Sequence, residues 1–119
     1  MKAQIYITDD ERIKCQKIAD AFAELEKDDI MVLDAGRFGF VKLQYYTFLS
    51  GFEVVVTFTD SQTMFEDLWE EWFHTQLILL GKAMNVGDIY YDDIFNRLPK
   101  KKKKELMKKR SYFIRRSKK

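Results

Sequence analysis

Few residues of this 119-residue chain are of the types that carry out acid–base, nucleophilic or metal chemistry, because it contains one histidine and one cysteine. Glu71 and His74 have the three-residue spacing of a carboxylate-bridged di-iron site, but that site needs a second such pair, and the chain has no second histidine. Cys15 has no activating group beside it, and its spacing is that of a small core residue. A pairing of Cys15 with His74 stays open, although no local signature supports it. The sequence therefore predicts a protein that is not an enzyme.

Motifs for bound metals and nucleotides are also missing from the sequence. It has no glycine-rich nucleotide loop, no paired-cysteine zinc spacing and no calcium loop. Asp92 and Asp93 are adjacent, so on a helix their carboxylates would point about 100° apart and would not share a ligand. We therefore expect no metal site, no cofactor and no small-molecule substrate.

Charge is distributed very unevenly along the chain. Residues 1–98 contain 9 Lys and Arg against 18 Asp and Glu, a net charge of −9. Residues 99–119 contain 12 Lys and Arg against Glu105 alone, a net charge of +11, and the two parts together give the overall +2. We therefore divide the domain into an acidic α+β body, residues 1–98, and a basic C-terminal helix or tail, residues 99–119, which we call the basic segment.

The basic segment is the strongest functional signal in the sequence. Its cations can neutralise phosphates and release counterions, which gives sequence-independent affinity for nucleic acid. Three interpretations stay open: the segment docks on the acidic body, it contacts nucleic acid, or it binds an acidic protein or an anionic membrane surface. We predict a small binding module that presents to nucleic acid or another polyanion the side chains of Lys100, Lys101, Lys102, Lys103, Lys104, Lys108, Lys109, Arg110, Arg115 and Arg116.

Aromatic residues give a second set of candidates. Tyr112 and Phe113 in the basic segment could stack on unpaired bases. A helix expected over residues 61–85 has an apolar stripe that includes Trp69 and Trp72 and is wider than one small sheet covers. That width predicts the alternative function, a protein–protein interaction or assembly module that forms a homodimer or a partner complex.

The segment Gly36-Arg37-Phe38-Gly39-Phe40-Val41-Lys42-Leu43 resembles the octapeptide of the RNA-recognition motif family, and Ile5-Tyr6-Ile7 resembles that family's other signature strand. The resemblance implies that Phe38 and Phe40 stack bases on the surface of the sheet. It departs from the family in the order of its first two residues, in its last residue, which is leucine, and in the strand expected over residues 52–59, where the family has its second helix. The alternative is an aromatic hairpin that packs its own core.

The element order expected over residues 9–85 is also similar to that of the double-stranded-RNA-binding domain, whose second helix begins with lysines that grip phosphates. The corresponding turns here contain Asp60, Glu66, Asp67, Glu70 and Glu71, which would repel a phosphate. The sign of the charge therefore excludes this second resemblance.

Hydrophobic periodicity predicts the elements of the first half of the chain. A strand over residues 3–8 precedes a helix that begins at the capping-box pair Thr8 and Glu11 and ends near Lys27-Asp28. Short turns join three further strands, which favours an antiparallel meander. The alternation of the second of these strands changes phase, which indicates a bulge or a strand covered on both faces. The three strands are expected over residues 30–33, 38–46 and 52–59.

Three helices are expected in the second half, over residues 61–85, 92–98 and 99–116. The last begins at Pro99 and has the pairs Leu106/Phe113 and Met107/Ile114 on one side. The fold class is therefore α+β with the order β-α-β-β-β-α-α-α. We expect a four-stranded antiparallel sheet with the first and main helices on one face. The lone cysteine, and the lack of a signal peptide or an apolar run that could span a membrane, predict a cytoplasmic protein.

Overall fold

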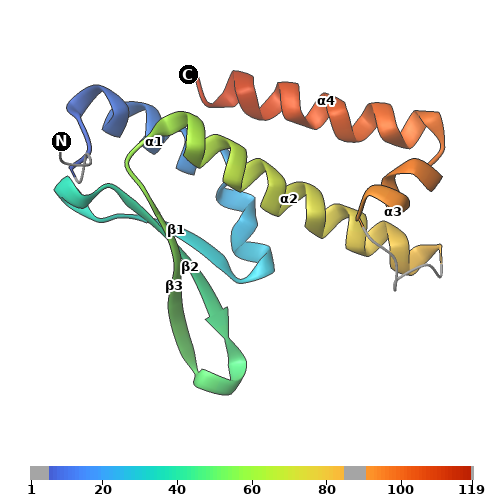
Figure 1. Cartoon of the computed structure of the whole chain (residues 1–119), viewed down its shortest axis with the longest axis horizontal. Coiled ribbons are helices and arrows are strands. Elements are labelled where there is room, and N and C mark those ends of the chain that lie inside the picture. The colour runs from blue at the N-terminus through green and yellow to red at the C-terminus, as the bar shows by residue number, and fades with distance from the viewer. Residues whose placement is uncertain (1–5, 85–90, 119) are drawn as a thin grey trace.

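The computed structural model of the chain describes residues 6–84 and 91–118. Its order of elements confirms the predicted α+β class with an antiparallel sheet and a helical second half (Figure 1). Two short 3-10 turns, η2 (Gly36–Phe38) and η3 (Thr47–Leu49), connect the strands. The main elements are α1 (Asp9–Ala21), the 3-10 helix η1 (Ala23–Asp28), β1 (Ile30–Asp34), β2 (Phe40–Tyr46), β3 (Gly51–Phe58), α2 (Ser61–Ala83), α3 (Tyr91–Arg97) and α4 (Lys100–Arg116).

The starts of α1 and α2 are tied together by one carboxylate. The Thr8 hydroxyl accepts a hydrogen bond from the backbone N–H of Glu11, as the capping box predicts. The Glu11 side chain, which was expected to reach back to Thr8, instead accepts hydrogen bonds from the backbone N–H and the hydroxyl of Ser61, at 2.9 and 3.0 Å. The second half of the predicted capping box is therefore wrong, because the approach of α2 offers Glu11 two donors that no local spacing reveals.

The described strands form a three-stranded antiparallel sheet in the order β1-β2-β3. Lys42 of β2 opposes Val56 of β3, whereas Leu43 opposes Val54, so Val55 is an extra residue at a bulge. The bulge expected in the second strand therefore lies in its partner β3, while β2 itself keeps a regular alternation. The fourth expected strand, residues 3–8, falls mostly outside the described residues, and its described part, Tyr6 to Thr8, is not in a strand.

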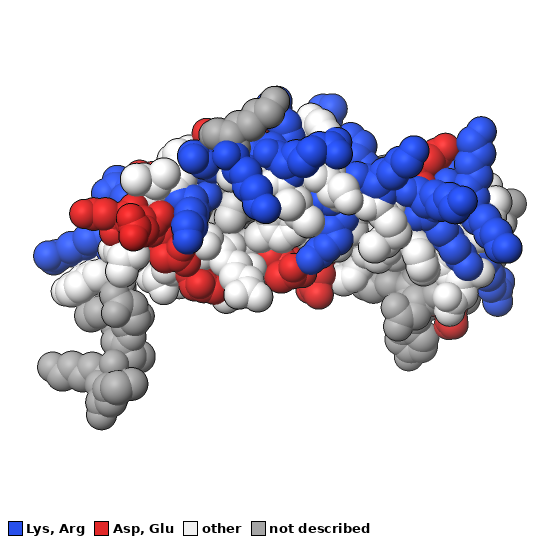
Figure 2. All heavy atoms as spheres, turned by 90° about the horizontal axis from the view of Figure 1, so that it is seen from above, with Lys and Arg blue, Asp and Glu red and all other residues white. Residues whose placement is uncertain are grey.

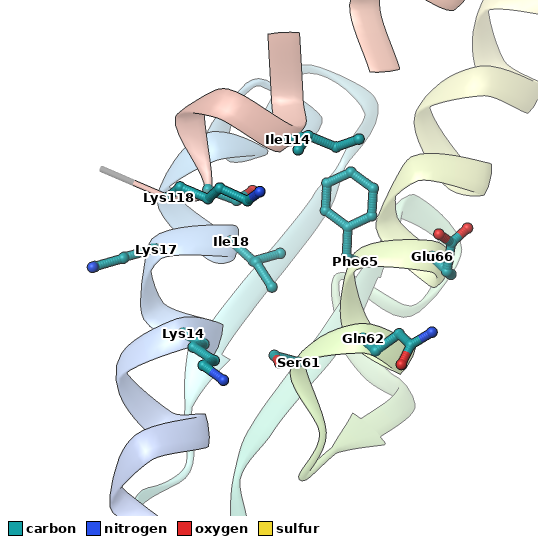
Figure 3. A pocket seen from close by; sticks show the side chains of 10 residues that line it. Lys14, Lys17, Ile18, Ser61, Gln62, Phe65, Glu66, Ile114 and Lys118 are labelled. Carbon is teal, nitrogen blue, oxygen red and sulfur yellow. The ribbon is translucent and has the colours of Figure 1, made fainter. Parts of the chain in front are cut away.

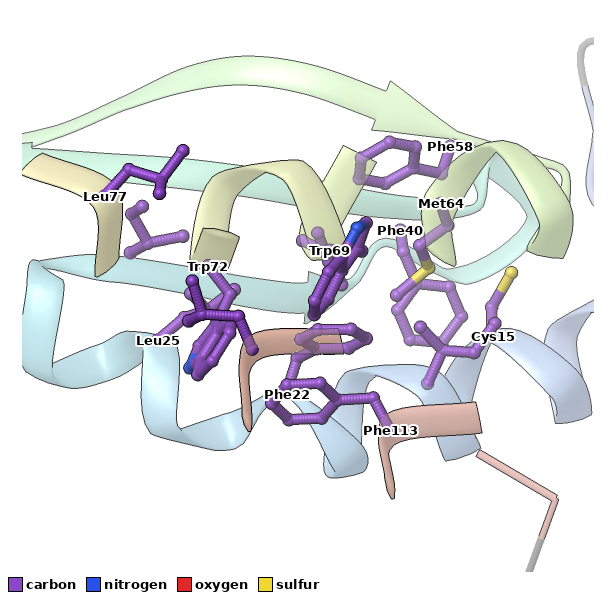
Figure 4. Close-up of a cluster of buried hydrophobic side chains, with 14 of the residues drawn as sticks. Cys15, Phe22, Leu25, Phe40, Phe58, Met64, Trp69, Trp72, Leu77 and Phe113 are labelled. Carbon is purple, nitrogen blue, oxygen red and sulfur yellow. The ribbon is translucent and has the colours of Figure 1, made fainter. Parts of the chain in front are cut away.

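The sheet, α1 and α2 pack around a core of aromatic and aliphatic side chains. Phe40 and Phe58 point from the sheet toward Met64 and Trp69 of α2 (Figure 4). Gly39 precedes β2 with a φ of +98°, and a Cβ at that position would lie 2.0 Å from the carbonyl oxygen of Phe58. The turn into β2 therefore requires glycine.

The final helix is part of the same core. Leu106 and Phe113 of α4 are buried, and the Phe113 ring stacks on Phe22 with a centroid separation of 4.3 Å. Met107, which the spacing placed on the same side, is 46% exposed, so the apolar side of α4 is narrower than expected. The basic segment is thus a helix that docks by its apolar side.

Candidate polyanion-binding surface

The outer side of α4 is a continuous stripe of cations. At about 100° per residue, Lys101, Lys104, Lys108 and Arg115 lie on the side of the helix opposite Leu106 and Phe113. The stripe runs for about 21 Å along the axis, at 1.5 Å per residue. Figure 2 shows the face of the molecule that contains α4, where lysine and arginine side chains gather in a band along the length of the molecule.

One of the predicted cations is held by the body. The guanidinium of Arg110 donates two hydrogen bonds to the Glu66 carboxylate on α2, one of them 3.3 Å long from Nη1 to Oε2. The same group lies 5.4 Å from the ring centre of Phe65 and 5.6 Å from that of Trp69. Arg110 therefore fixes α4 to α2 by an ion pair and by cation–π contact, and its charge is largely used within the chain.

Three further cations have partners that leave their charge on the surface. Lys109 lies 4.8 Å from the ring centre of Tyr112, and Lys103 lies 5.6 Å from that of Phe95. Lys102 forms an ion pair with Glu105 across one turn of α4, and both side chains are half exposed. An exposed pair of this kind is worth at most about 1 kcal/mol and is easily exchanged for an external phosphate.

The remaining candidate cations are exposed and form no ion pair with any described residue. They are Lys100, Lys101, Lys104, Lys108, Arg115 and Arg116.

Two acidic side chains of α2 pair with the sheet and not with α4. Lys42, the buried cation of the sheet, donates hydrogen bonds to Asp67 and Glu71 at 2.5 and 3.0 Å. Burial lowers the pKa of Lys42, but these hydrogen bonds outweigh that effect and raise it above its ordinary value. Two carboxylates of α2 are thus directed toward the sheet, which reduces the negative charge available to the lysines of α4.

The aromatic candidates separate into buried and exposed rings. Phe40, Trp69, Trp72 and Phe113 are buried in the core of their own chain, where a base could not reach them without opening the fold. The exposed candidates are Phe38, at 55%, and Tyr112, at 38%. Tyr112 lies four residues after Lys108, one turn further along the same helix, so one aromatic ring borders the basic stripe.

The arrangement implied by the RNA-recognition motif does not occur in the structure. Phe40 faces the helices, and Phe38 lies in the turn η2 before β2 begins. The two rings therefore share no exposed surface of the sheet. The apolar stripe of α2, which predicted assembly through Trp69 and Trp72, is covered by Phe113 of α4, whose ring centre is 6.3 and 5.4 Å from those of the two tryptophans.

The residues considered for catalysis are not brought together. Burial raises the pKa of the Cys15 thiol to about 11, and the nearby carboxylates of Glu11 and Asp60 add to the increase. Asp60 caps the start of α2, and His74 lies about 20 Å further along that helix, so Cys15 and His74 do not form a pair. Within the described part of the chain, no group of three or more His, Cys, Asp or Glu side chains could hold a metal ion.

A groove that the sequence did not predict extends the basic surface onto α1. Its volume is about 460 Å³, and Ile18, Phe65 and Ile114 point toward one another across its floor (Figure 3). Lys14 and Lys118 lie at its edge, and Lys17 points away from it. Lys14 and Lys17 lie in the acidic body, more than 80 residues before the basic segment, so only the packing of α4 against α1 places them beside it.

Neither α2 nor any other helix within residues 6–84 and 91–118 is long and apolar enough to cross a membrane. Comparison of the chain with protein families, with curated proteins and with solved structures finds no match in any of the three.

Proposed function

We propose that the chain binds nucleic acid, independently of sequence, through the outward stripe of α4. One observation supports this proposal most strongly. α4 docks by Leu106 and Phe113, while six of its cations stay exposed and form no ion pair with the described part of the body.

The arrangement suits a phosphate backbone in two respects. The inner side of α4 fixes the helix, so its cations are held in a row before a ligand arrives, and less ordering entropy is lost on binding. Each phosphate that meets a lysine or arginine releases condensed counterions, and this release favours binding whatever the bases are. No base-reading side chain is needed, and the body acts as a scaffold.

Tyr112 adds a preference for single strands. Its half-exposed ring is next to Lys108 on the helix surface, so an unpaired base could stack there while the adjoining phosphates contact the lysines. Stacking of a base on an aromatic ring is worth about 1–3 kcal/mol. In a duplex the bases are already stacked, so Tyr112 would contribute little.

A charge-neutralised variant tests the proposal directly. Four exposed cations on α4 are replaced together: Lys101→Gln, Lys104→Gln, Lys108→Gln and Arg115→Gln. Glutamine has a helix propensity close to that of lysine and arginine, so α4 should persist. At about 1 kcal/mol for each charge pair in water, the loss of four pairs should weaken binding of a single-stranded oligonucleotide about 100- to 1,000-fold.

The matched control removes the same number of charges outside α4. It combines Arg12→Gln, Lys27→Gln, Arg37→Gln and Lys82→Gln, all exposed and outside both α4 and the groove, and it should weaken binding about threefold or less, because only long-range attraction changes. Equal losses in the two variants would show that net charge, and not the stripe on α4, determines binding. Wild-type chain that leaves the oligonucleotide unbound at low salt would refute the proposal and favour an acidic protein as the partner.

A further inference from the structure

Within residues 6–84 and 91–118, no helix or further strand covers one face of the sheet. Lys42 reaches Asp67 and Glu71 of α2, so the even-numbered residues of β2 face the helices and the odd-numbered residues face away. The strand register then assigns the residues of the outer side, which we call the open face. They are Met31, Leu33, Val41, Leu43, Tyr45, Phe52, Val54 and Thr57.

The open face contains no charged side chain. An antiparallel sheet that meets water on one side normally alternates apolar with polar residues, but seven of these eight are apolar or aromatic. Val54 is 60% exposed, Phe52 48% and Leu33 44%.

The β2–β3 hairpin also extends away from the helices (Figure 1). β3 pairs with β2 on one edge, and no other described strand lies along its second edge. A neutral apolar surface of this kind is typical of a protein–protein interface.

The two ends of the open face carry opposite charges. Glu26 and Asp29, both exposed, lie where β1 begins, beside a cavity of about 320 Å³ that Met31, Tyr45 and Phe52 also line. Arg37, also exposed, lies at the other end, in the turn η2 between β1 and β2. The strand direction thus runs from an acidic end to a basic end.

We propose that a second copy of the chain covers the open face, with its strands running in the reverse direction. Two sheets stack face to face about 10 Å apart when both inner faces are apolar. A two-fold axis perpendicular to the strands then brings Arg37 of each copy over Glu26 and Asp29 of the other. The same symmetry brings the uncharged middle of one open face against the uncharged middle of the other, so the two identical faces meet without charge repulsion. A partner protein that binds through charged side chains would find no charged residue to pair with there.

The size of the open face sets the strength of the dimer. The three strands have five, seven and eight residues, and at about 3.3 Å per residue and about 4.8 Å between strands they cover about 300 Å² in projection. The two copies together would bury about 600 Å² in projection, below the roughly 1,200 Å² of a stable specific interface, so we expect a weak, reversible dimer that dissociates on dilution. α4 packs on α1 and, through Phe113 and Arg110, on α2, away from the open face. The dimer therefore leaves both basic stripes uncovered, and neither proposal depends on the other.

Sedimentation velocity of the full chain across concentrations from about 1 to 200 μM tests the proposal, since weak specific interfaces dissociate in this range. Wild-type chain should change from monomer to dimer. Val54→Lys places a charge at the centre of the open face and should raise the dissociation constant tenfold or more, because a charge buried there has no partner. The matched control, Ile13→Lys, places the same charge on an exposed position of α1 and should leave the dimer unchanged.

Charge reversal at the two ends tests the direction of the strands. Glu26→Arg and Arg37→Glu should each weaken the dimer, and the double variant should restore it, because the reversed pairs still match across the two-fold axis. A chain that stays monomeric throughout, or a dimer that Val54→Lys leaves intact, would overturn the proposal. A double variant no stronger than the single variants would overturn the reversed arrangement.

Discussion

Replacement of Phe113 by alanine tests how α4 is held against the body. The Phe113 side chain is fully buried, its ring stacks on Phe22 at 4.3 Å, and its edge meets Trp72 at 5.4 Å. The change removes the ring and leaves a cavity where α4 meets α1, η1 and α2. The cations of the basic segment are not altered.

The expected cost follows from this burial. Replacing a buried phenylalanine by alanine costs about 3–5 kcal/mol, which combines lost transfer energy with the energy of the cavity. A domain of this size is typically stable by about 5–15 kcal/mol, so the variant should lose about a fifth or more of its stability. The same replacement at Met107, on the same helix but 46% exposed, should change the free energy of unfolding by about 0.5 kcal/mol or less.

Urea unfolding followed by tryptophan fluorescence measures both variants. The two tryptophans of the chain, Trp69 and Trp72, lie beside Phe113 and report directly on its surroundings. We expect Phe113→Ala to shift the midpoint strongly to lower urea and Met107→Ala to leave it nearly unchanged. If the two variants unfold at the same urea concentration, α4 is not docked through Phe113, and the described packing is wrong.

Three further predictions concern titratable groups. Lys42→Met should destabilise the fold by about 1–3 kcal/mol, since it leaves two partly exposed carboxylates without their cation. Because the folded state raises the pKa of Lys42, this difference from wild type should be constant from neutral pH to pH 10.5 and shrink above it in pH-dependent urea unfolding. Asp60→Ala should cost about 1 kcal/mol, because Asp60 caps α2. Hydrogen bonds from the Thr63 hydroxyl and backbone N–H lower the pKa of Asp60. The extra stability of wild type over the alanine variant should therefore disappear as the pH falls below 3.8, where the carboxylate is protonated. A stability difference that persists at that pH would contradict the cap. Burial raises the pKa of Cys15 to about 11. The thiol should therefore react with an aromatic disulfide at pH 8 only when urea unfolds the chain. Fast reaction of the folded chain would contradict the burial of Cys15.

Local patterns predicted most of the elements because each has a clear period or boundary signal. The β-favouring run from Phe52 and the apolar stripe of α2 correspond to real elements. The strict alternation expected along that run is wrong, because the bulge turns Phe52 and Val54 to the opposite face from Val56 and Phe58. The extra residue belongs to β3, at Val55, because a bulge depends on how two strands pair and not on one strand alone.

Contacts between distant parts of the chain were beyond sequence reasoning. Arg110 and Glu66 are 44 residues apart, and the hydrogen bond between Ser61 and Glu11 spans 50 residues, so no spacing rule connects them. The same limit applied to the aromatic candidates. The width of the apolar stripe over residues 61–85 indicated that Trp69 and Trp72 exceed what the sheet can cover, whereas Phe113 of α4 packs against both. Composition did locate the basic segment, because charge density can be read without a fold.

The salt dependence of nucleic-acid binding tests the central claim, that α4 displays its positive charge to a polyanion outside the chain. Wild-type chain is titrated with a single-stranded oligonucleotide at several salt concentrations. With four to six phosphate contacts, the slope of log K against log salt should be about −3 to −4, which is a loss of about 50- to 300-fold in affinity between 50 and 200 mM. Affinity that does not change with salt, or no binding at 50 mM, would contradict the claim.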